Sequence, residues 1–340
     1  MNSNPLISVI MPVFNCVSFI EEAVDSILNQ TLPDFEFIII DDASTDGTID
    51  LLKKFTDSRI KFIFKGKNQG VSCAVNDGFR LAKGKYIARM DGDDISVKER
   101  FEKQVAILEN NLKIFICASW IQFFGNANNV IKYKETHNEI ITELLINCSI
   151  SISSSMFRRK ELSHYFFDEN KKSGEDYDFW TKVAWLGEFY NIQEVLLLYR
   201  VHDKQASIKH KPQQIIDDIK IKLFLFKKLN YDTIKYTDNL IEKMLLLNKP
   251  IQIEEFSLFL NWLKKLIFLN KKSSIYPQKE FEDVLKRIKR TWLFSIYFKT
   301  MTIGITKRWR FNLLFKLNIQ DVLYILQLKF RELRKSIFKK

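Results

Sequence analysis

The chain has 340 residues, of which 46% are apolar and 28% are charged, and its formal net charge is +12. This length accommodates about two domains of ~150 residues, and the apolar content excludes a wholly disordered protein. The lack of a ~18-residue uncharged apolar run disfavours a membrane-spanning protein, and the lack of a signal peptide disfavours a secreted one. The cysteines are not paired as in a disulfide scaffold. We therefore expect a reduced, cytoplasmic protein.

The first half of the chain alternates strand-like and helix-like segments. Apolar, β-rich runs predict strands at 7–14, 35–40, 60–64 and 86–90. Between them, helical patterns are found at 18–28, 48–55 and 71–82. This alternation is typical of an α/β domain with a doubly wound, mostly parallel sheet and flanking helices. In such sheets ligands bind beyond the carboxyl ends of the strands, where the strand order reverses.

The second half differs in both pattern and charge. From about Gln213, apolar residues recur at helical spacing, most clearly at 256–268, 281–288 and 319–338. Residues 208–340 hold 29 Lys and Arg against 12 Asp and Glu, a net +17, which leaves −5 for residues 1–207. We therefore predict an α/β domain at 1–207 and a basic helical domain at 208–340.

Carboxylates follow two of the predicted strands. Asp91, Asp93 and Asp94 come directly after the strand at 86–90, and such close carboxylates repel one another unless a cation lies between them. Mg²⁺ and Mn²⁺ take oxygen ligands and commonly link one or two carboxylates to substrate phosphates. Asp91 and Asp93 are thus candidate metal ligands, and the alternative is a solvated acidic turn that caps the next helix.

Two further loops are candidates for ligand contact. Asp42 follows the strand at 35–40 and could accept hydrogen bonds from a base or ribose, whereas Asp46 and Thr48 after it suit helix capping and turns. The stretch 65–70 combines Lys, Asn68 and Gly, which suits a loop close to an anionic ligand. An ordinary strand-to-helix loop would have the same composition, so both interpretations stay open.

Taken in chain order, these segments resemble the nucleotide-sugar glycosyltransferases of family 2, which have the GT-A fold. The segments that carry the resemblance are Pro12 to Asn15, DDASTDGT, KNQGVSCAVNDG, GKYIARMDGDD and Gln104, and it extends over about residues 7–207. It implies a metal-dependent, inverting transfer of a sugar from a nucleoside diphosphate, usually UDP, with Mn²⁺ or Mg²⁺ as the cofactor.

The resemblance also implies roles for single residues. Asp91 and Asp93 would form the DxD element that holds metal and diphosphate, with Asp94 as a supporting carboxylate or alternative ligand. The nucleotide-sugar site would comprise Pro12, Val13, Asn15, Asp42, Asn68, Asp91, Arg200 and His202. The last two belong to a YRxH segment expected to close over the donor, although a His after a strand can equally be structural.

The Glu175-Asp176 pair matches the family's catalytic acidic pair. Inversion needs a carboxylate opposite the leaving diphosphate to take the proton of the acceptor hydroxyl, so Asp176 would be the base and Glu175 would position the acceptor. Without the resemblance, both acids would simply favour a helix N-terminus. Many relatives carry a His where Ile152-Ser153 stands here, which weakens predictions about the acceptor.

We predict that the enzyme moves a sugar from a UDP-sugar to a hydroxyl of a lipid-linked saccharide in surface polysaccharide or lipopolysaccharide biosynthesis. Basic pairs such as Lys286-Arg287 and Lys307-Arg308 alternate with aromatics such as Trp292 and Trp309, which suits an anionic membrane surface at the inner face of the cell membrane. The alternative is a helical subdomain packed on the core. Nucleic acid is not an expected partner, because no recognition motif accompanies the charge.

Two other functions remain as alternatives. A metal-dependent nucleotidyltransferase would need a Gly-rich basic loop after the first strand, where Pro12 to Asn15 stands instead. A non-catalytic membrane- or nucleic-acid-binding scaffold would not need the complete set of carboxylates.

Overall fold

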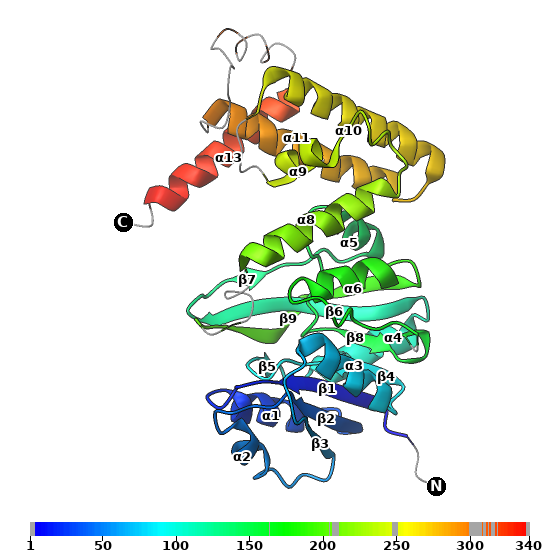
Figure 1. The fold of residues 1–340 in the computed structure, drawn as a ribbon, viewed down its shortest axis with the longest axis vertical. Coiled ribbons are helices and arrows are strands. Elements are labelled where there is room, and N and C mark those ends of the chain that lie inside the picture. The colour runs from blue at the N-terminus through cyan, green and yellow to red at the C-terminus, as the bar shows by residue number, and fades with distance from the viewer. Residues whose placement is uncertain are drawn as a thin grey trace. The chain divides into compact units, whose positions relative to one another are not determined.

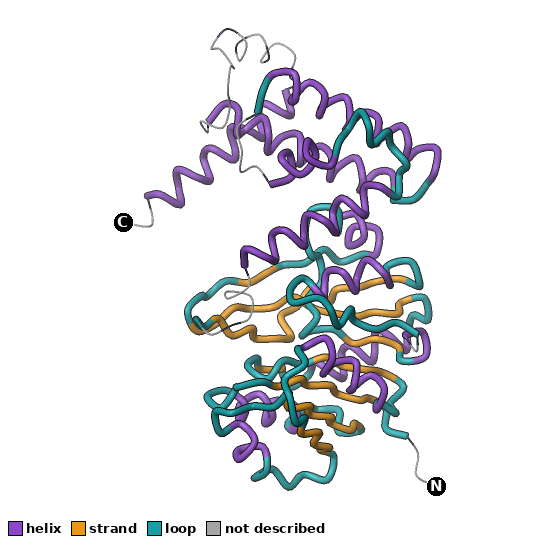
Figure 2. Tube along the Cα trace, viewed as in Figure 1, coloured by secondary structure: helices purple, strands orange, loops and turns teal. Residues whose placement is uncertain are grey.

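The structure is a computed structural model that describes residues 4–162, 164–203, 205, 211–246, 251–298, 308, 311, 313, 317 and 319–337. The chain divides into two compact units, Met1–Asp218 and Ile219–Lys340. Strands lie in the first unit, and the described part of the second is built mainly of helices (Figures 1 and 2). The predicted domain boundary between residues 207 and 208 lies outside the described residues, as do Lys307 and Trp309 of the predicted basic, aromatic pattern.

The elements follow one another as the labels in Figure 1 show. The strands are β1 (Ile7–Val13), β2 (Phe35–Asp41), β3 (Ile60–Phe64), β4 (Tyr86–Arg89), β5 (Ile95–Ser96), β6 (Ile114–Gly125), β7 (Val130–Ile131), β8 (Met156–Arg158) and β9 (Glu188–Val201). The helices of the first unit are α1 (Ile20–Leu28), α2 (Thr48–Leu52), α3 (Val71–Leu81), α4 (Arg100–Asn110), α5 (His137–Glu143), the 3₁₀ turn η1 (Lys160–Leu162) and α6 (Glu175–Val183). The chain continues through α8 (Lys211–Lys227), α9 (Asp238–Leu246), α10 (Ile253–Ser273), α11 (Gln278–Phe298) and α13 (Ile319–Ile337).

One sheet runs through the first unit in the order β3-β2-β1-β4-β8-β6-β9-β5, with β7 paired to β6. Strands β3, β2, β1 and β4 are parallel, β8 is antiparallel to both of its neighbours, and β6 and β9 are parallel. The predicted α/β fold with a mostly parallel sheet is therefore confirmed. The strand order reverses between β1 and β4, because the chain first steps outward to β3 and then returns to the other side of β1.

The central strands are buried on both faces, which explains their uninterrupted apolar sequences. On one face, Val9 and Met11 of β1 join Val24 of α1 in the main apolar cluster. Side chains alternate along a strand, so Ile10 points to the opposite face, where α3 packs. The approach of α3 is so close that a Cβ at Gly78 would lie 2.4 Å from Ile10 Cγ2. These contacts fix β1 and β2, and with them the loops at their carboxyl ends.

The second unit has an aromatic core. Trp262 of α10 stacks with Phe259 at 5.7 Å between ring centroids, and Trp292 of α11 is buried beside them. No helix among the described residues is long and apolar enough to cross a membrane.

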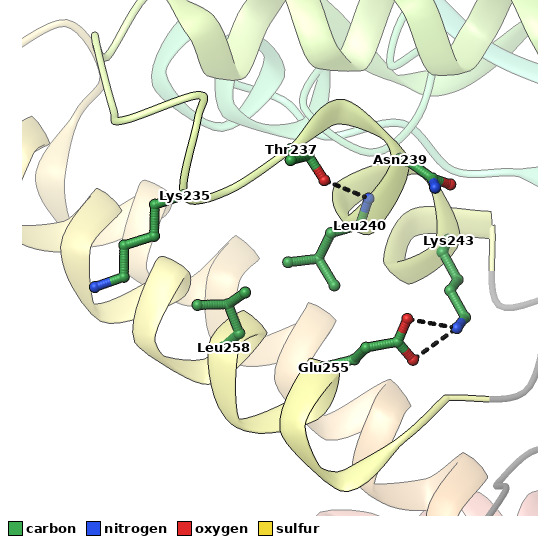
Figure 3. Close-up of a pocket in the computed structure, with 7 residues that line it drawn as sticks. All are labelled: Lys235, Thr237, Asn239, Leu240, Lys243, Glu255 and Leu258. Atoms are coloured by element: carbon green, nitrogen blue, oxygen red, sulfur yellow. Dashed lines mark hydrogen bonds and ion pairs between the residues drawn. The ribbon is translucent and has the colours of Figure 1, made fainter.

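A hollow of about 620 Å³ lies in the second unit beside α9 and α10 (Figure 3). Lys243 and Glu255 form an ion pair of 2.6 Å in its wall. The full lining consists of Lys235, Thr237, Asn239, Leu240, Lys243, Glu255 and Leu258.

Candidate active site

The loops that follow β1, β2 and β4 meet at the carboxyl edge of the sheet. Val13, the last residue of β1, is paired in register with Asp41 of β2. The backbone N–H of Asp42 donates to the Val13 carbonyl at 2.8 Å. Asn15, Asp42 and Asp91 therefore follow three adjacent strands at the reversal point of the sheet, where open α/β sheets bind their ligands.

Asn15 ties the loop after β1 to the loop after β2. Its backbone is left-handed, with φ at 54°, and its N–H donates to Ser44 Oγ at 2.8 Å. Its side-chain oxygen accepts the N–H of Thr45 at 2.8 Å. Just before it, at the end of β1, Pro12 is half-buried and Val13 is buried.

Asp42 is buried and holds the loop in front of α3. Its carboxylate accepts the backbone N–H groups of Gln69 and Gly70, at 3.0 and 2.7 Å, and pairs with Lys65 at 3.2 Å. Asn68 is exposed in the same loop. Asp42 thus shapes a loop at the predicted nucleotide site, and a contact to base or ribose would come in addition to these bonds.

The acidic turn after β4 is contacted from three directions. Asp91 accepts a hydrogen bond from the Arg89 guanidinium at 2.7 Å and another from the Ser153 hydroxyl. Asp93 Oδ2 lies 3.1 Å from His202 Nε2. Burial, followed by the charge of Asp91, raises the pKa of Asp93, and the contact with His202 opposes this rise. The structure therefore brings the DxD residues and His202 together.

Arg200 and Asp94 join this turn to β9. Asp94 is buried, and its Oδ1 accepts the backbone N–H of Arg200 at 2.9 Å. The Arg200 side chain donates to the carbonyl of Asp93 at 2.8 Å and lies over the ring of Phe19 at 4.8 Å. Burial, then the charges of Asp93 and Asp91, raises the pKa of Asp94 well above its usual range. Asp94 supports the turn from the protein interior.

Two buried arginines, Arg89 and Arg100, support the turn, and no role was predicted for either of them. Arg100 is fully buried and donates to the carbonyl of Arg89 at 2.6 Å and to Gln104 Oε1 at 3.1 Å. Burial, then the charge of Arg89, lowers the pKa of Arg100 to about 9, while the charges of Asp94 and Asp91 oppose the change. The two cations offset part of the negative charge of the turn. The one sequence signal for this supporting role is that Arg89 and Arg100 lie on either side of the acidic run at 91–94.

Asp176 lies in the first turn of α6. One oxygen accepts the backbone N–H of Tyr177 at 2.6 Å, and the other lies 3.9 Å from the Cys148 Sγ. Burial, then the charge of Glu175 and more weakly those of Asp218 and Asp91, raises the pKa of Asp176 to about 7. Asp91 is thus one of the charges that act on Asp176. A carboxyl group with a pKa near neutrality suits general base catalysis.

The side chains of the turn offer part of the ligand set of a divalent cation, and substrate oxygens would complete its coordination. Within the described ranges, no group of three or more His, Cys, Asp and Glu residues is arranged to hold a metal ion. Asp91 and Asp93 still offer two carboxylates, and Mg²⁺ is usually bound by one or two carboxylates together with substrate phosphates. The raised pKa of Asp93, caused partly by Asp91, reflects a repulsion that a cation would relieve.

Comparisons with known proteins give the family. The model of glycosyl transferase family 2 matches residues 8–167. An uncharacterized glycosyltransferase of Haemophilus influenzae is 33% identical over 232 residues, which cover 63% of this chain and 71% of the relative. A putative glycosyltransferase of Bacillus subtilis, EpsE, is 33% identical over 218 residues, covering 62% of this chain and 78% of the relative. This chain belongs to glycosyl transferase family 2.

Solved structures that bind nucleotide sugars share the fold of this family 2 member. S. aureus TarS 1-349 in complex with UDP-GlcNAc has a TM-score of 0.58 at 17% identity, over 84% of this chain and 91% of TarS 1-349. The mannosyltransferase PcManGT from Pyrobaculum calidifontis, in complex with GDP-Man and Mn²⁺, has a TM-score of 0.53 at 15% identity, over 87% of this chain and 88% of that chain. At these identities the likeness shows the GT-A fold. The predicted family and fold are thus confirmed, and the protein is a glycosyltransferase.

Proposed function

We propose that this family 2 enzyme transfers a sugar from a UDP-sugar, with inversion at the anomeric carbon, to a hydroxyl group of a saccharide acceptor. One observation carries the proposal: Asp176, in the first turn of α6, is a carboxyl group whose pKa is raised to about 7, as suits a general base. We propose that this base and the acidic turn act on the same donor, which the effect of the Asp91 charge on the pKa of Asp176 supports.

The donor would lie across the carboxyl edge of the sheet. Its nucleotide would contact the loops of Asn15 and Asp42, with the floor at Pro12 and Val13 and with Asn68 at the rim. Its diphosphate would lie over the acidic turn, within reach of the Arg200 and His202 side chains that already contact Asp93. Mn²⁺ or Mg²⁺, when bound by Asp91 and Asp93, would supply positive charge for the departing phosphate oxygens. TarS, with UDP-GlcNAc bound to the same fold, supports the choice of UDP.

The acceptor hydroxyl would be activated by Asp176. As its oxygen bonds to the anomeric carbon, its proton passes to a carboxylate oxygen of Asp176, and the bond to the diphosphate oxygen breaks on the opposite face. The products are the glycoside with inverted configuration and UDP. General base catalysis of this kind contributes roughly 10²- to 10⁴-fold. Glu175, next to the base, would orient the acceptor.

We place this chemistry in a catalytic domain at residues 1–207, followed by a basic helical domain at 208–340. The acceptor would be a lipid-linked saccharide at the cytoplasmic face of the cell membrane, in surface polysaccharide or lipopolysaccharide biosynthesis. The net +17 of residues 208–340 supports contact with an anionic surface.

The test is a donor screen with the full-length chain. UDP-, GDP- and dTDP-sugars are incubated with Mn²⁺, with and without lipid-linked saccharides, and nucleotide release is measured. We expect release of UDP that increases with acceptor. Asp176→Asn should keep UDP binding, seen as thermal stabilisation, and lose transfer. Asp178→Asn is the matched control, because it makes the same change on the same helix at a residue paired with Lys182 at 2.6 Å.

Three outcomes would overturn the proposal. Unchanged turnover in Asp176→Asn would remove this residue as the base. Release of pyrophosphate in place of UDP would favour a nucleotidyltransferase. Absence of any stabilisation by nucleotides with Mn²⁺ would favour a non-catalytic scaffold.

A further inference from the structure

Helix α13 of the helical unit carries an exposed apolar stripe. Ile319, Leu323, Leu326 and Phe330 are 76%, 54%, 44% and 67% exposed. They are spaced by three or four residues, so they lie along one side of the helix. We call these four residues the α13 stripe. A contiguous exposed apolar surface of this kind usually marks a contact with a partner or a membrane.

The opposite side of α13 is held against α11 (Figure 1). Asp321 is buried and forms ion pairs with Lys289 at 2.6 Å and Arg290 at 2.8 Å, and Ile325 is buried as well. Burial alone would raise the pKa of Asp321, but the hydrogen bonds from Arg290 and Lys289 outweigh it and lower the pKa. These contacts set the rotation of α13 within its unit, so the stripe is turned outward by the fold.

Cations border and follow the stripe. Lys329 lies in the same part of α13, with its Nζ 5.3 Å from the ring centroid of the exposed Phe298 and 3.1 Å from the carboxylate of Glu332. From Lys329 to Lys340 the sequence holds six Lys and Arg against one Glu. Long basic side chains can cover apolar surface with their stems while their charges remain at a polar boundary. Apolar side chains flanked by cations match the layering of an anionic bilayer, with phosphates outside and acyl chains beneath.

We propose that the α13 stripe binds the surface of an anionic lipid bilayer, with α13 lying in the plane of the interface. The stripe would enter the boundary between headgroups and acyl chains, and the neighbouring cations would contact lipid phosphates. A second copy of this chain would also cover the stripe, but it would bring another strongly basic surface to the same place, and like charges oppose that association. The inference deepens the proposed function, and it rests on the proposal there that the acceptor is a lipid-linked saccharide.

The experiment is flotation of the full-length chain with vesicles. Vesicles of phosphatidylcholine with phosphatidylglycerol are compared with vesicles of phosphatidylcholine alone, at low and high salt. We expect binding to the anionic vesicles, with a loss of affinity at high salt. The double variant Leu323→Glu with Phe330→Glu should lose about tenfold or more in affinity for anionic vesicles. The control, Gln320→Glu with Gln327→Glu, makes the same charge change at exposed positions of α13 outside the stripe and should retain most of the binding.

The readouts separate lipid binding from catalysis. UDP release with a water-soluble acceptor should be equal in the wild type and both double variants, which also reports that they are folded. The Asp176→Asn variant should float as the wild type does, so failure of the catalytic proposal would leave the lipid result intact. Equal vesicle binding of the stripe variant and its control would overturn the inference. So would a stripe-dependent dimer in light scattering without lipid, which would assign the stripe to self-association.

Discussion

The pH dependence of sugar transfer should report the pKa of Asp176. Its carboxyl must be deprotonated to accept a proton, and burial with the charge of Glu175 raises its pKa to about 7. Only roughly one tenth of the enzyme would then carry the active carboxylate one pH unit below this value, and roughly one hundredth two units below. An ordinary Asp, with a pKa of ~3.9, would be more than ~90% deprotonated at both pH values.

The raised pKa of Asp176 also has a cost in stability, and its sign can be tested. A carboxyl whose pKa is higher in the folded than in the unfolded state binds more protons when folded, so its contribution to stability is fully present below pH ~4 and is lost as the pH rises through about 7. The upper limit of this loss is about 4 kcal/mol, because a tenfold difference in proton affinity between the two states corresponds to ~1.4 kcal/mol. The side chain is partly accessible, so water reduces this cost. Asp176→Asn should therefore unfold at a higher temperature than the wild type at alkaline pH, while it loses transfer.

The pH dependence of sugar transfer is measured as steady-state UDP release between about pH 5 and pH 9, with acceptor present and Mn²⁺ saturating. We expect kcat/KM to fall about tenfold per pH unit on the acid side and to level off above neutrality. Glu175→Gln should move the acid limb to lower pH, because it removes the neighbouring negative charge. The Asp178→Asn control should keep the wild-type profile. A wild-type profile that stays flat from neutrality down to about pH 5 would refute the assignment of Asp176 as a base with a raised pKa.

Three further predictions concern other parts of the catalytic unit. Ser153→Ala removes the hydroxyl that donates to Asp91 and orients its carboxylate, so the Mn²⁺ concentration needed for half-maximal activity should rise about tenfold, at the low end of the ~10–100-fold loss usual for such partners of a metal ligand; an unchanged Mn²⁺ titration would contradict this. Asp42→Ala frees the loop in front of α3 and should weaken UDP binding in calorimetry much more than it lowers kcat; equal UDP affinity would show that the loop is not part of the nucleotide site. Gly78→Ala should lower the free energy of unfolding by about 1–3 kcal/mol in urea, whereas Gly66→Ala, whose Cβ would meet nothing within 4 Å, should be nearly neutral.

The sequence predicted the elements that follow from local pattern. The run from Phe35 to Ile40 is apolar throughout because both faces of β2 are covered, and a pattern of that kind is visible without coordinates. Asp91 and Asp93 could be placed at a strand end for the same reason. The helical period of α13 was likewise visible.

The contacts that shape the site were not predictable, because they join residues far apart in the chain. Ser153 reaches Asp91 across 62 positions. That contact depends on how the loop before β8 passes the acidic turn, which no local pattern encodes. Asp42 was predicted to contact the nucleotide, but its bonds to the loop in front of α3 required the packing of that loop. Similarly, the outward side of α13 is decided by the ion pairs of Asp321 with α11.

The arginine pair under the acidic turn has a consequence for how a cation and the donor would affect each other's binding. Arg89 pairs with Asp91 at 2.7 Å and Arg100 is buried nearby, so part of the negative charge of the turn is already offset before any cation binds. A divalent cation held by Asp91 and Asp93 would add positive charge and so favour a diphosphate. Cation and donor should accordingly strengthen each other's binding by the same factor, so that the empty enzyme holds neither tightly and the loaded enzyme holds both.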